Sequence, residues 1–350
     1  MADTTLTSLL LSALFFACSG EDAVRTSSTP LNATASDPAN ITEPDDVLVA
    51  RGKYLVDSVA ACADCHTPRG PMGAPLTDQY LAGAECFIRL DNGSCLNTPN
   101  LTDHATGLRN RTDEEIKRMI VDGMRPTAAG EEPLFPVMGS YVLHNLTERD
   151  ISAIVAYLRT VPGVDHAVPR RGPEFDVPGT PPDQEVFPPR AGGRRGARGP
   201  AVPLDPSVVP EPKPGYPERE AALRGRYLAT QACLVCHSGH IDPDPQWLDY
   251  GKLFAGGEEF DVGLPTYAYA GNITSDPETG IGDWSLEDIV AAMTHGTDTG
   301  GDGLCPPMPV GDTAAFGRMT DEDMLDIAHF IKSLPPIVDA TSHACPFPPM

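Results

Sequence analysis

The chain is poor in basic residues and has no long apolar run. Its 350 residues include 25 Lys and Arg against 49 Asp and Glu, which gives a formal net charge of −24 at pH 7. Such a surface repels nucleic acid and anionic lipid headgroups. The charge is compatible with a partner that has a basic docking patch. It is equally compatible with an exported protein whose surface is simply well solvated. No stretch approaches the roughly 20 apolar residues that a membrane-spanning helix requires.

What the chain does contain is the pattern Cys-x-x-Cys-His, once in "ACADCH" at 61–66 and again in "ACLVCH" at 232–237. A zinc site would draw on further Cys or His close by, and a thioredoxin-like dithiol would not need the histidine. Attachment of haem c uses all three residues, because both thiols form thioethers with the haem and the histidine ligates the iron. The pattern therefore predicts two covalently bound haem c groups. Their protein ligands are Cys62, Cys65 and His66 in the first copy and Cys233, Cys236 and His237 in the second.

The N-terminal sequence "TSLLLSALFFACSGED" ends a short apolar run at Cys18. This is typical of a signal peptide over 1–18, and Cys18 could be the acylated first residue of a lipoprotein. An ordinary cleaved signal or a misassigned start are the alternatives, since "MADTT" carries no Lys or Arg. Because haem c is attached outside the cytoplasm, we expect a periplasmic or cell-envelope protein, with a lipid anchor on Cys18 as its contact with the membrane.

Four further cysteines remain, an even number in an oxidising compartment. Cys86 and Cys95 bracket "FIRLDNGS", whose Asn-Gly pair indicates a tight turn, so we expect a local disulfide. A bond between Cys305 and Cys345 would tie the C-terminal tail, 338–350, back onto the chain. Free thiols are the alternative in both cases.

The chain repeats itself with an offset of 171–173 residues. "ARGKYLVDSVAACADCH" matches "LRGRYLATQACLVCH", and "LTERDISAIVAYLRTVP" matches "MTDEDMLDIAHFIKSLP". So long a period predicts two folded domains, over 46–163 and 215–337. The Ser-, Thr-, Asn- and Pro-rich segment 19–45 is expected to be a disordered tether. Residues 164–214, dense in Pro and carrying "RAGGRRGARG", are predicted to bury too little surface to fold and to form a linker.

Each domain offers three helices, so the predicted fold is all-α. The first helix leads into the cysteine motif, at about 46–58 and 218–230. The middle helix begins at Thr112 or Ser285, each followed three residues later by an acidic residue as in a capping box. The last helix begins at Thr147 or Thr320. Its apolar residues recur with the i, i+3, i+4, i+7 spacing of a buried face: Ile151, Ile154, Val155 and Leu158, then Met324, Ile327, Ala328 and Ile331.

A haem iron also needs a ligand on its second face, and electron carriers often use Met. Met138 in "PLFPVMGSY" and Met308 in "LCPPMPVGD" occupy equivalent Pro-marked loops, so we predict that each faces its histidine across an apolar cleft. Met124, Met293 and Met319 are more typical of packing residues. Bis-histidine ligation would instead draw on the remaining candidates, His104, His144, His240 and His295.

Together, the two Cys-x-x-Cys-His motifs, "NITSDPETGIGDWS", the Pro-flanked Met loops and "DISAIVAYLRTVP" resemble tandem class I cytochrome c domains. The resemblance covers about 46–163 and 217–337, and it is closest to the cytochrome subunits of flavin and quinone dehydrogenases. It implies that Trp284, and Arg109 or Asn110 in the first copy, lie near the haem edge. The first copy has "GLRNRT" where the family has Trp or Phe.

The expected function is that of an exported di-haem cytochrome carrying single electrons from a dehydrogenase to an oxidase or another cytochrome, without catalytic residues of its own. The alternative is a di-haem cytochrome c peroxidase, which would need one haem with an open face, whereas two Met-bearing loops predict two closed ones. A structural protein with disulfide or zinc pairs would require both haem motifs to be coincidental.

Overall fold

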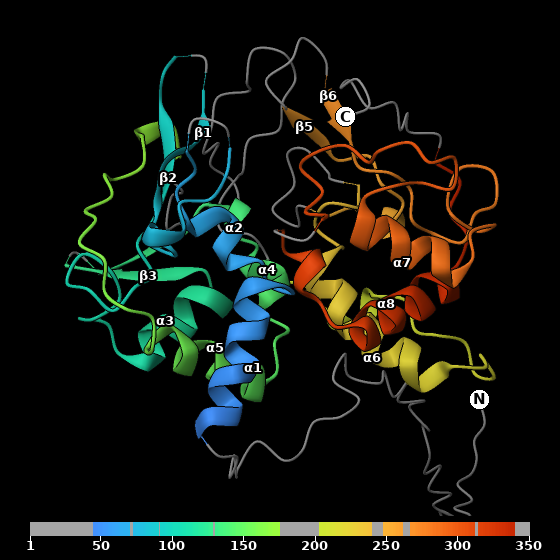
Figure 1. Cartoon of the computed structure of the whole chain (residues 1–350), viewed down its shortest axis with the longest axis horizontal. Coiled ribbons are helices and arrows are strands. Elements are labelled where there is room, and N and C mark those ends of the chain that lie inside the picture. The colour runs from blue at the N-terminus through green and yellow to red at the C-terminus, as the bar shows by residue number, and fades with distance from the viewer. Residues whose placement is uncertain are drawn as a thin grey trace, which may run out of the picture.

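The computed structural model describes residues 45–70, 73–90, 92–128, 130–175, 203–239, 248–261, 267–311 and 314–339. The predicted signal peptide, the tether up to residue 44, the middle of the predicted linker and the tail from residue 340 lie outside the described residues. Figure 1 shows two helical lobes, one blue to green and one yellow to red, that correspond to the two halves of the repeat.

The first lobe holds five helices and two antiparallel hairpins among its described residues. The helices are α1 (Asp45–Asp57), α2 (Cys62–His66), α3 (Asp113–Val121), α4 (Ser140–Leu143) and α5 (Glu148–Leu158). The strand β1 (Ala84–Arg89) pairs with β2 (Cys95–Thr98), and β3 (Met124–Thr127) pairs with β4 (Gly130–Pro133). A disulfide joins Cys86 to Cys95 across the first hairpin, which confirms that prediction.

The second lobe repeats the three long helices as α6 (Arg219–Ala232), α7 (Leu286–His295) and α8 (Asp321–Ser333). Its hairpin consists of β5 (Glu259–Asp261) and β6 (Tyr267–Tyr269). Cys305 is disulfide-bonded, and Cys345, its predicted partner, lies outside the described residues. The structure is thus mostly helical, as predicted. The short hairpins correct the all-α prediction, because their strands of three to six residues leave little alternation to read in the sequence.

The helix starts follow the predicted capping chemistry. Thr112 and Ser285 each accept the backbone N–H three residues on, while the side chains of Glu115 and Asp288 return a bond to the cap residue's own N–H. These bonds satisfy donors that have no partner within a helix. Gly296 ends α7 with φ of +68°, a conformation that glycine adopts without strain.

In each lobe the first helix crosses the last at very close range. A Cβ added to Gly52 of α1 would overlap the backbone oxygen of Ala153 on α5, and one added to Gly225 of α6 would overlap that of Asp326 on α8. The predicted apolar faces of α5 and α8 are buried beside these crossings. This pair of crossed helices is the frame from which the cysteine motif of each lobe extends.

The two ends of the predicted linker differ from the sequence-based expectation, because both are packed. Phe175 is 1% exposed and its ring meets Phe135 edge-on at 5.3 Å. At the other end, the buried Arg226 of α6 donates to the backbone oxygens of Pro206 and Val209, at 2.8 and 2.7 Å. Backbone carbonyls and a few apolar anchors thus hold segments whose composition lacks helical or strand periodicity.

The lobes contact each other through two equivalent pairs of side chains. The Tyr54 hydroxyl of α1 donates to Asp323 at the start of α8, at 2.5 Å. In return, the Tyr227 hydroxyl of α6 donates to Asp150 at the start of α5, at 2.8 Å. The short helix α4 of the first lobe also contacts α6 of the second. We call these two contacts the tyrosine contacts.

Candidate functional site

Both predicted proximal histidines are held in one orientation, with His66 buried and His237 partly buried. The Nδ1 atom of His66 lies 2.8 Å from the backbone oxygen of Pro99, and that of His237 lies 2.8 Å from the backbone oxygen of Gly271. A carbonyl oxygen can only accept, so Nδ1–H donates in each case and the lone pair is on Nε2. Burial also lowers the pKa of His66 and favours its neutral form. A neutral imidazole with a fixed Nδ1–H bond is the usual state of a metal-ligating histidine.

The four cysteines of the two motifs carry free thiols. Burial raises the pKa of Cys62 and of Cys233 to about 12, so these thiols are neutral at physiological pH. A thioredoxin-like pair works through a thiol whose pKa is lowered. Neutral, unpaired thiols beside an oriented histidine fit covalent attachment of haem c instead.

In the second lobe these residues line a cavity of about 610 Å³, a size typical of a cofactor site. Cys233, Cys236 and His237 contribute to its wall, and so does Met308, from the loop between α7 and α8. Most of the remaining wall is apolar, with Ile273, Ile281, Ile289, Ala292, Phe316 and Ile331. The fold thus brings together all four of the residues predicted for this haem from two separate stretches of sequence.

In the first lobe, Met138 ends the short 3-10 helix Pro136–Met138, between β4 and α4. Its side chain is partly buried against the same core that contains Val59 and Ala63 on either side of Cys62. The loop therefore stands at the equivalent place in the chain.

The two lobes differ where the resemblance predicts a haem-edge aromatic. Trp284 lines the second cavity, and its backbone oxygen accepts a bond from Lys332 at 2.8 Å. In the first lobe, Arg159 makes the equivalent bond, to the backbone oxygen of Arg111 at 2.5 Å. The residue equivalent to Trp284 in the first lobe is thus Arg111, and not Arg109 or Asn110 as expected. Arg109 instead binds the backbone oxygen of Asp103. The shared offset of 173 residues could have identified Arg111 from the sequence.

The competing ligands lie elsewhere or serve as packing. Met319 is buried in the core, Met293 is buried at the wall of the second cavity, and Met124 is in strand β3. His104 pairs with Thr106, and His144 donates to the backbone oxygen of Val121 on the surface. His240 lies outside the described residues.

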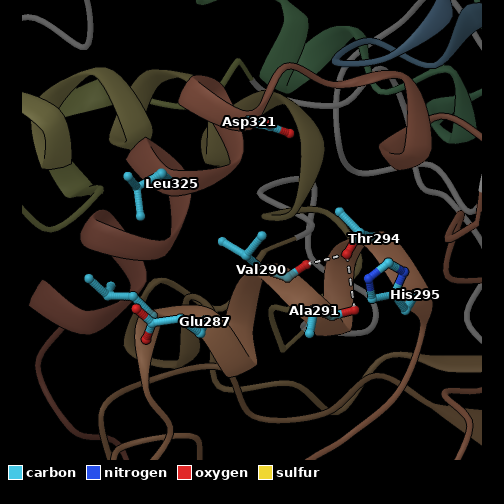
Figure 2. Close-up of a pocket in the computed structure, with 8 residues that line it drawn as sticks. Glu287, Val290, Ala291, Thr294, His295, Asp321 and Leu325 are labelled. Atoms are coloured by element: carbon cyan, nitrogen blue, oxygen red, sulfur yellow. Dashed lines mark hydrogen bonds between the residues drawn. The ribbon is translucent and has the colours of Figure 1, made fainter.

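His295 belongs to a separate pocket of about 360 Å³ that is lined by residues of α7 and α8 (Figure 2). Val290, Thr294 and Leu325 line it together with the carboxylates of Glu287 and Asp321. The Thr294 hydroxyl is turned back onto its own helix, donating to the backbone oxygen of Val290 at 2.9 Å. None of the cysteine-motif residues lines this pocket.

The described residues hold neither of two other features, a metal site and a membrane span. Within the ranges given above, no three or more His, Cys, Asp or Glu side chains gather in a way that could hold a metal ion. No helix among those described combines the length and the apolar character needed to cross a bilayer.

The sequence is similar to cytochrome subunits of several dehydrogenases. It is 39% identical over 113 residues to the fructose dehydrogenase cytochrome subunit of Gluconobacter japonicus, covering 32% of this chain and 22% of the relative. It is 37% identical over 119 residues to the gluconate 2-dehydrogenase cytochrome c subunit of Pantoea cypripedii, covering 33% and 24%. A diheme cytochrome c-type protein of Cereibacter sphaeroides is 28% identical over 117 residues, covering 33% and 37%. The chain thus matches about a fifth to a third of the length of these curated relatives.

The family described as Cytochrome c matches this chain twice, over residues 49–162 and 222–335. Each match contains one Cys-x-x-Cys-His motif and one Pro-flanked Met loop. Two such domains carry two covalently bound haem c groups, in agreement with the prediction from the motifs. With both halves of its repeat accounted for in this way, the chain belongs to the cytochrome c family.

Proposed function

We propose that this protein is an exported di-haem cytochrome that carries single electrons from a dehydrogenase to an oxidase or another cytochrome and catalyses no reaction itself. The observation that carries the proposal is the cavity where Cys233, Cys236, His237 and Met308 meet. These four groups are the set that attaches and ligates one haem. The similarity to cytochrome subunits of dehydrogenases supports a dehydrogenase as the electron donor.

We further propose His66 with Met138, and His237 with Met308, as the axial ligands of the two irons. Haem, when bound, supplies one-electron oxidation and reduction. The chain's own residues set where it is held and how easily it is reduced. The backbone oxygens of Pro99 and Gly271 fix the imidazoles, while a soft Met thioether and an apolar wall both favour the reduced iron.

The negative charge of the protein would steer its association with redox partners. A net charge of −24 directs association toward a basic docking patch and makes the rate of encounter fall with added salt. A periplasmic or cell-envelope location, with a lipid anchor on Cys18, remains part of the proposal. Cys18→Ala should release the protein from the membrane fraction of expressing cells, and its retention there would contradict the anchor.

The proposal is tested with the purified holoprotein. A pyridine haemochrome assay should give two haems per chain. Mixed in a stopped-flow instrument with substrate and the catalytic subunits of a sugar or alcohol dehydrogenase stripped of their cytochrome, both haems should be reduced and then reoxidised by a terminal oxidase. Fewer than two haems, or prompt turnover of hydrogen peroxide with a reduced cytochrome as donor, would overturn it.

A matched pair of variants tests the assigned ligands. Met308→Ala should lower the reduction potential of one haem, because the soft thioether is lost. Met319→Leu removes a buried methionine that does not line the cavity, and it should leave both potentials in place. Equal potentials in the two variants would show that Met308 is not a ligand.

A further inference from the structure

A residue of the second lobe reaches the haem-attachment motif of the first. Arg318 ends the short 3-10 helix Phe316–Arg318, just before α8. Its Nη1 atom donates to the backbone oxygen of Asp57 at 3.2 Å and lies 4.0 Å from the carboxylate of Asp64. Asp64 stands between Cys62 and Cys65, so this contact lies at the covalent attachment of the first haem.

The contact is sheltered enough for its charges to matter. The Arg318 side chain is 34% exposed and that of Asp64 is 23% exposed. Charges that are partly withdrawn from water interact more strongly than fully solvated ones. The backbone N–H of Ala315, also in the second lobe, stabilises the same carboxylate. Two groups of one lobe thus converge on a single side chain of the other.

The tyrosine contacts hold the lobes in the position that this requires. Tyr54 donates to Asp323 and also accepts the backbone N–H of Thr320, two residues beyond Arg318. Arg318 therefore sits beside a hydrogen-bonded anchor point, and its approach to Asp64 follows from how the lobes are docked.

The contact exists only once, although the chain is a repeat. The residue equivalent to Asp64 in the second motif is Val235, and the residue equivalent to Arg318 is Asn145. Asn145 donates to the backbone oxygen of Leu204, away from any attachment motif. Among the described residues, the second motif thus has no counterpart of this ion pair, and its haem serves as an internal reference.

We propose that Arg318 tunes the first haem from the second lobe, by holding and offsetting the charge of Asp64. A carboxylate beside a haem favours the oxidised iron, which carries one more positive charge, and a cation favours the reduced iron. Docking of the lobes therefore keeps the reduction potential of the first haem above the value that Asp64 alone would give it. This deepens the proposed electron-carrying function, which sets the context in which such tuning matters.

The test is a redox titration of the holoprotein that follows each haem separately, with Met138→His used to identify the step of the first haem. In Arg318→Gln the first haem should shift to lower potential, so that its ratio of reduced to oxidised form at a fixed ambient potential falls by about threefold. The second haem should not move. Arg219→Gln is the matched control, since Arg219 is similarly exposed, at 30%, and pairs with Glu211, which belongs to neither attachment motif.

Two further variants separate charge from a merely structural effect. Arg318→Lys should restore the potential, because it keeps the charge, and Asp64→Asn should raise the potential of the first haem. Equal shifts in both haems, no shift relative to Arg219→Gln, or no recovery in Arg318→Lys would each overturn the inference. The titration uses no dehydrogenase, so failure of the chain to accept electrons from one would overturn the proposed function and leave this result standing.

Discussion

The first helix of each lobe contains the same motif, Arg-Gly-x-Tyr-Leu. The lobes differ in which carboxylates accept hydrogen bonds from its Arg and Tyr side chains. In the first lobe a single carboxylate binds both the arginine of its own lobe and the tyrosine of the other lobe. Asp150 accepts hydrogen bonds from Nε and Nη2 of Arg51, each at 2.9 Å, and also from the hydroxyl of Tyr227 in the other lobe. With a side chain only 4% exposed, it joins the internal ion pair of the lobe to the contact between lobes.

In the second lobe these two tasks fall to different residues. Arg224 binds Asp326, at 2.6 and 2.8 Å, while Asp323 receives Tyr54 from the first lobe. The first lobe has Ala153 where the second has Asp326, so its Arg has no such carboxylate one turn further along. The two lobes therefore share the geometry of the helix crossing. The difference between Ala153 and Asp326 decides whether one carboxylate binds both the arginine of its own lobe and the tyrosine of the other, or two carboxylates divide these contacts.

The largest difference between the lobes should come from removing one attachment motif at a time. Cys62→Ser with Cys65→Ser should leave one haem per chain, and so should Cys233→Ser with Cys236→Ser, because each lobe binds its haem through its own thiols. Cys86→Ser with Cys95→Ser is the control, since that disulfide lies in a hairpin, and two haems should remain. A pyridine haemochrome assay measures the count. Loss of both haems from either motif variant would show that the lobes do not mature independently.

The helix crossings should respond alike in both lobes. Gly52→Ala and Gly225→Ala each place a Cβ against the backbone of the facing helix, and we expect a loss of about 3 kcal/mol in the free energy of unfolding. Denaturant unfolding monitored by circular dichroism measures it. Gly70→Ala is the control, because its nearest neighbour would be a flexible Leu76 side chain at 3.4 Å. A crossing variant as stable as Gly70→Ala would contradict the close contact.

Removing the equivalent carboxylates, Asp150 in the first lobe and Asp323 in the second, should destabilise the protein by different amounts. Asp150→Ala leaves the partly buried Arg51 without its ion-pair partner and frees Tyr227 as well, and we expect a loss of about 3 kcal/mol. Asp323→Ala removes the acceptor of Tyr54 alone and should cost about 1 kcal/mol. Thermal unfolding of the two holoproteins under the same conditions compares them. Equal losses would mean that sharing one carboxylate has no energetic consequence.

The smallest effect concerns the Tyr54 hydroxyl and is seen at high pH. Burial and the neighbouring Asp323 raise the pKa of Tyr54 from 10.0 to about 12 in the folded protein. The unfolded chain thus ionises first, so this contribution to stability is complete below pH 10 and is lost as the pH rises toward 12. Tyr54→Phe should cost about 1 kcal/mol at pH 7 and should lose less stability over that alkaline range than the unaltered protein. Denaturant unfolding at pH 7 and pH 11 checks both.

Tyr80→Phe provides the comparison for that experiment. Tyr80 also donates to a carboxylate, that of Asp57, but both residues belong to the first lobe. Small-angle X-ray scattering should show the lobes moving apart as the pH rises from 7 to 11 in the unaltered protein and in Tyr80→Phe, which both keep the Tyr54 hydroxyl, and changing less with pH in Tyr54→Phe, which lacks it. The reverse pattern would contradict the role of Tyr54 between the lobes.

Much of the fold could be predicted because its signals are local. The capping boxes at Thr112 and Ser285 depend on residues three positions apart, and the apolar faces of α5 and α8 on spacings within two turns. The packed ends of the predicted linker could not be read in this way. Their stability comes from single anchors such as Phe175 and from carbonyls that bind Arg226, and neither leaves a periodic pattern.

The sequence by itself determined the cofactor, because Cys-x-x-Cys-His is a complete chemical description of haem attachment in five residues. It also determined the repeat and the candidate Met loops. Only the tertiary structure decided that Met308 shares a cavity with His237, that Gly52 and Gly225 admit a facing backbone, and that Arg318 reaches Asp64. Each of these depends on the relative placement of segments far apart in the chain, which packing fixes and local sequence does not encode.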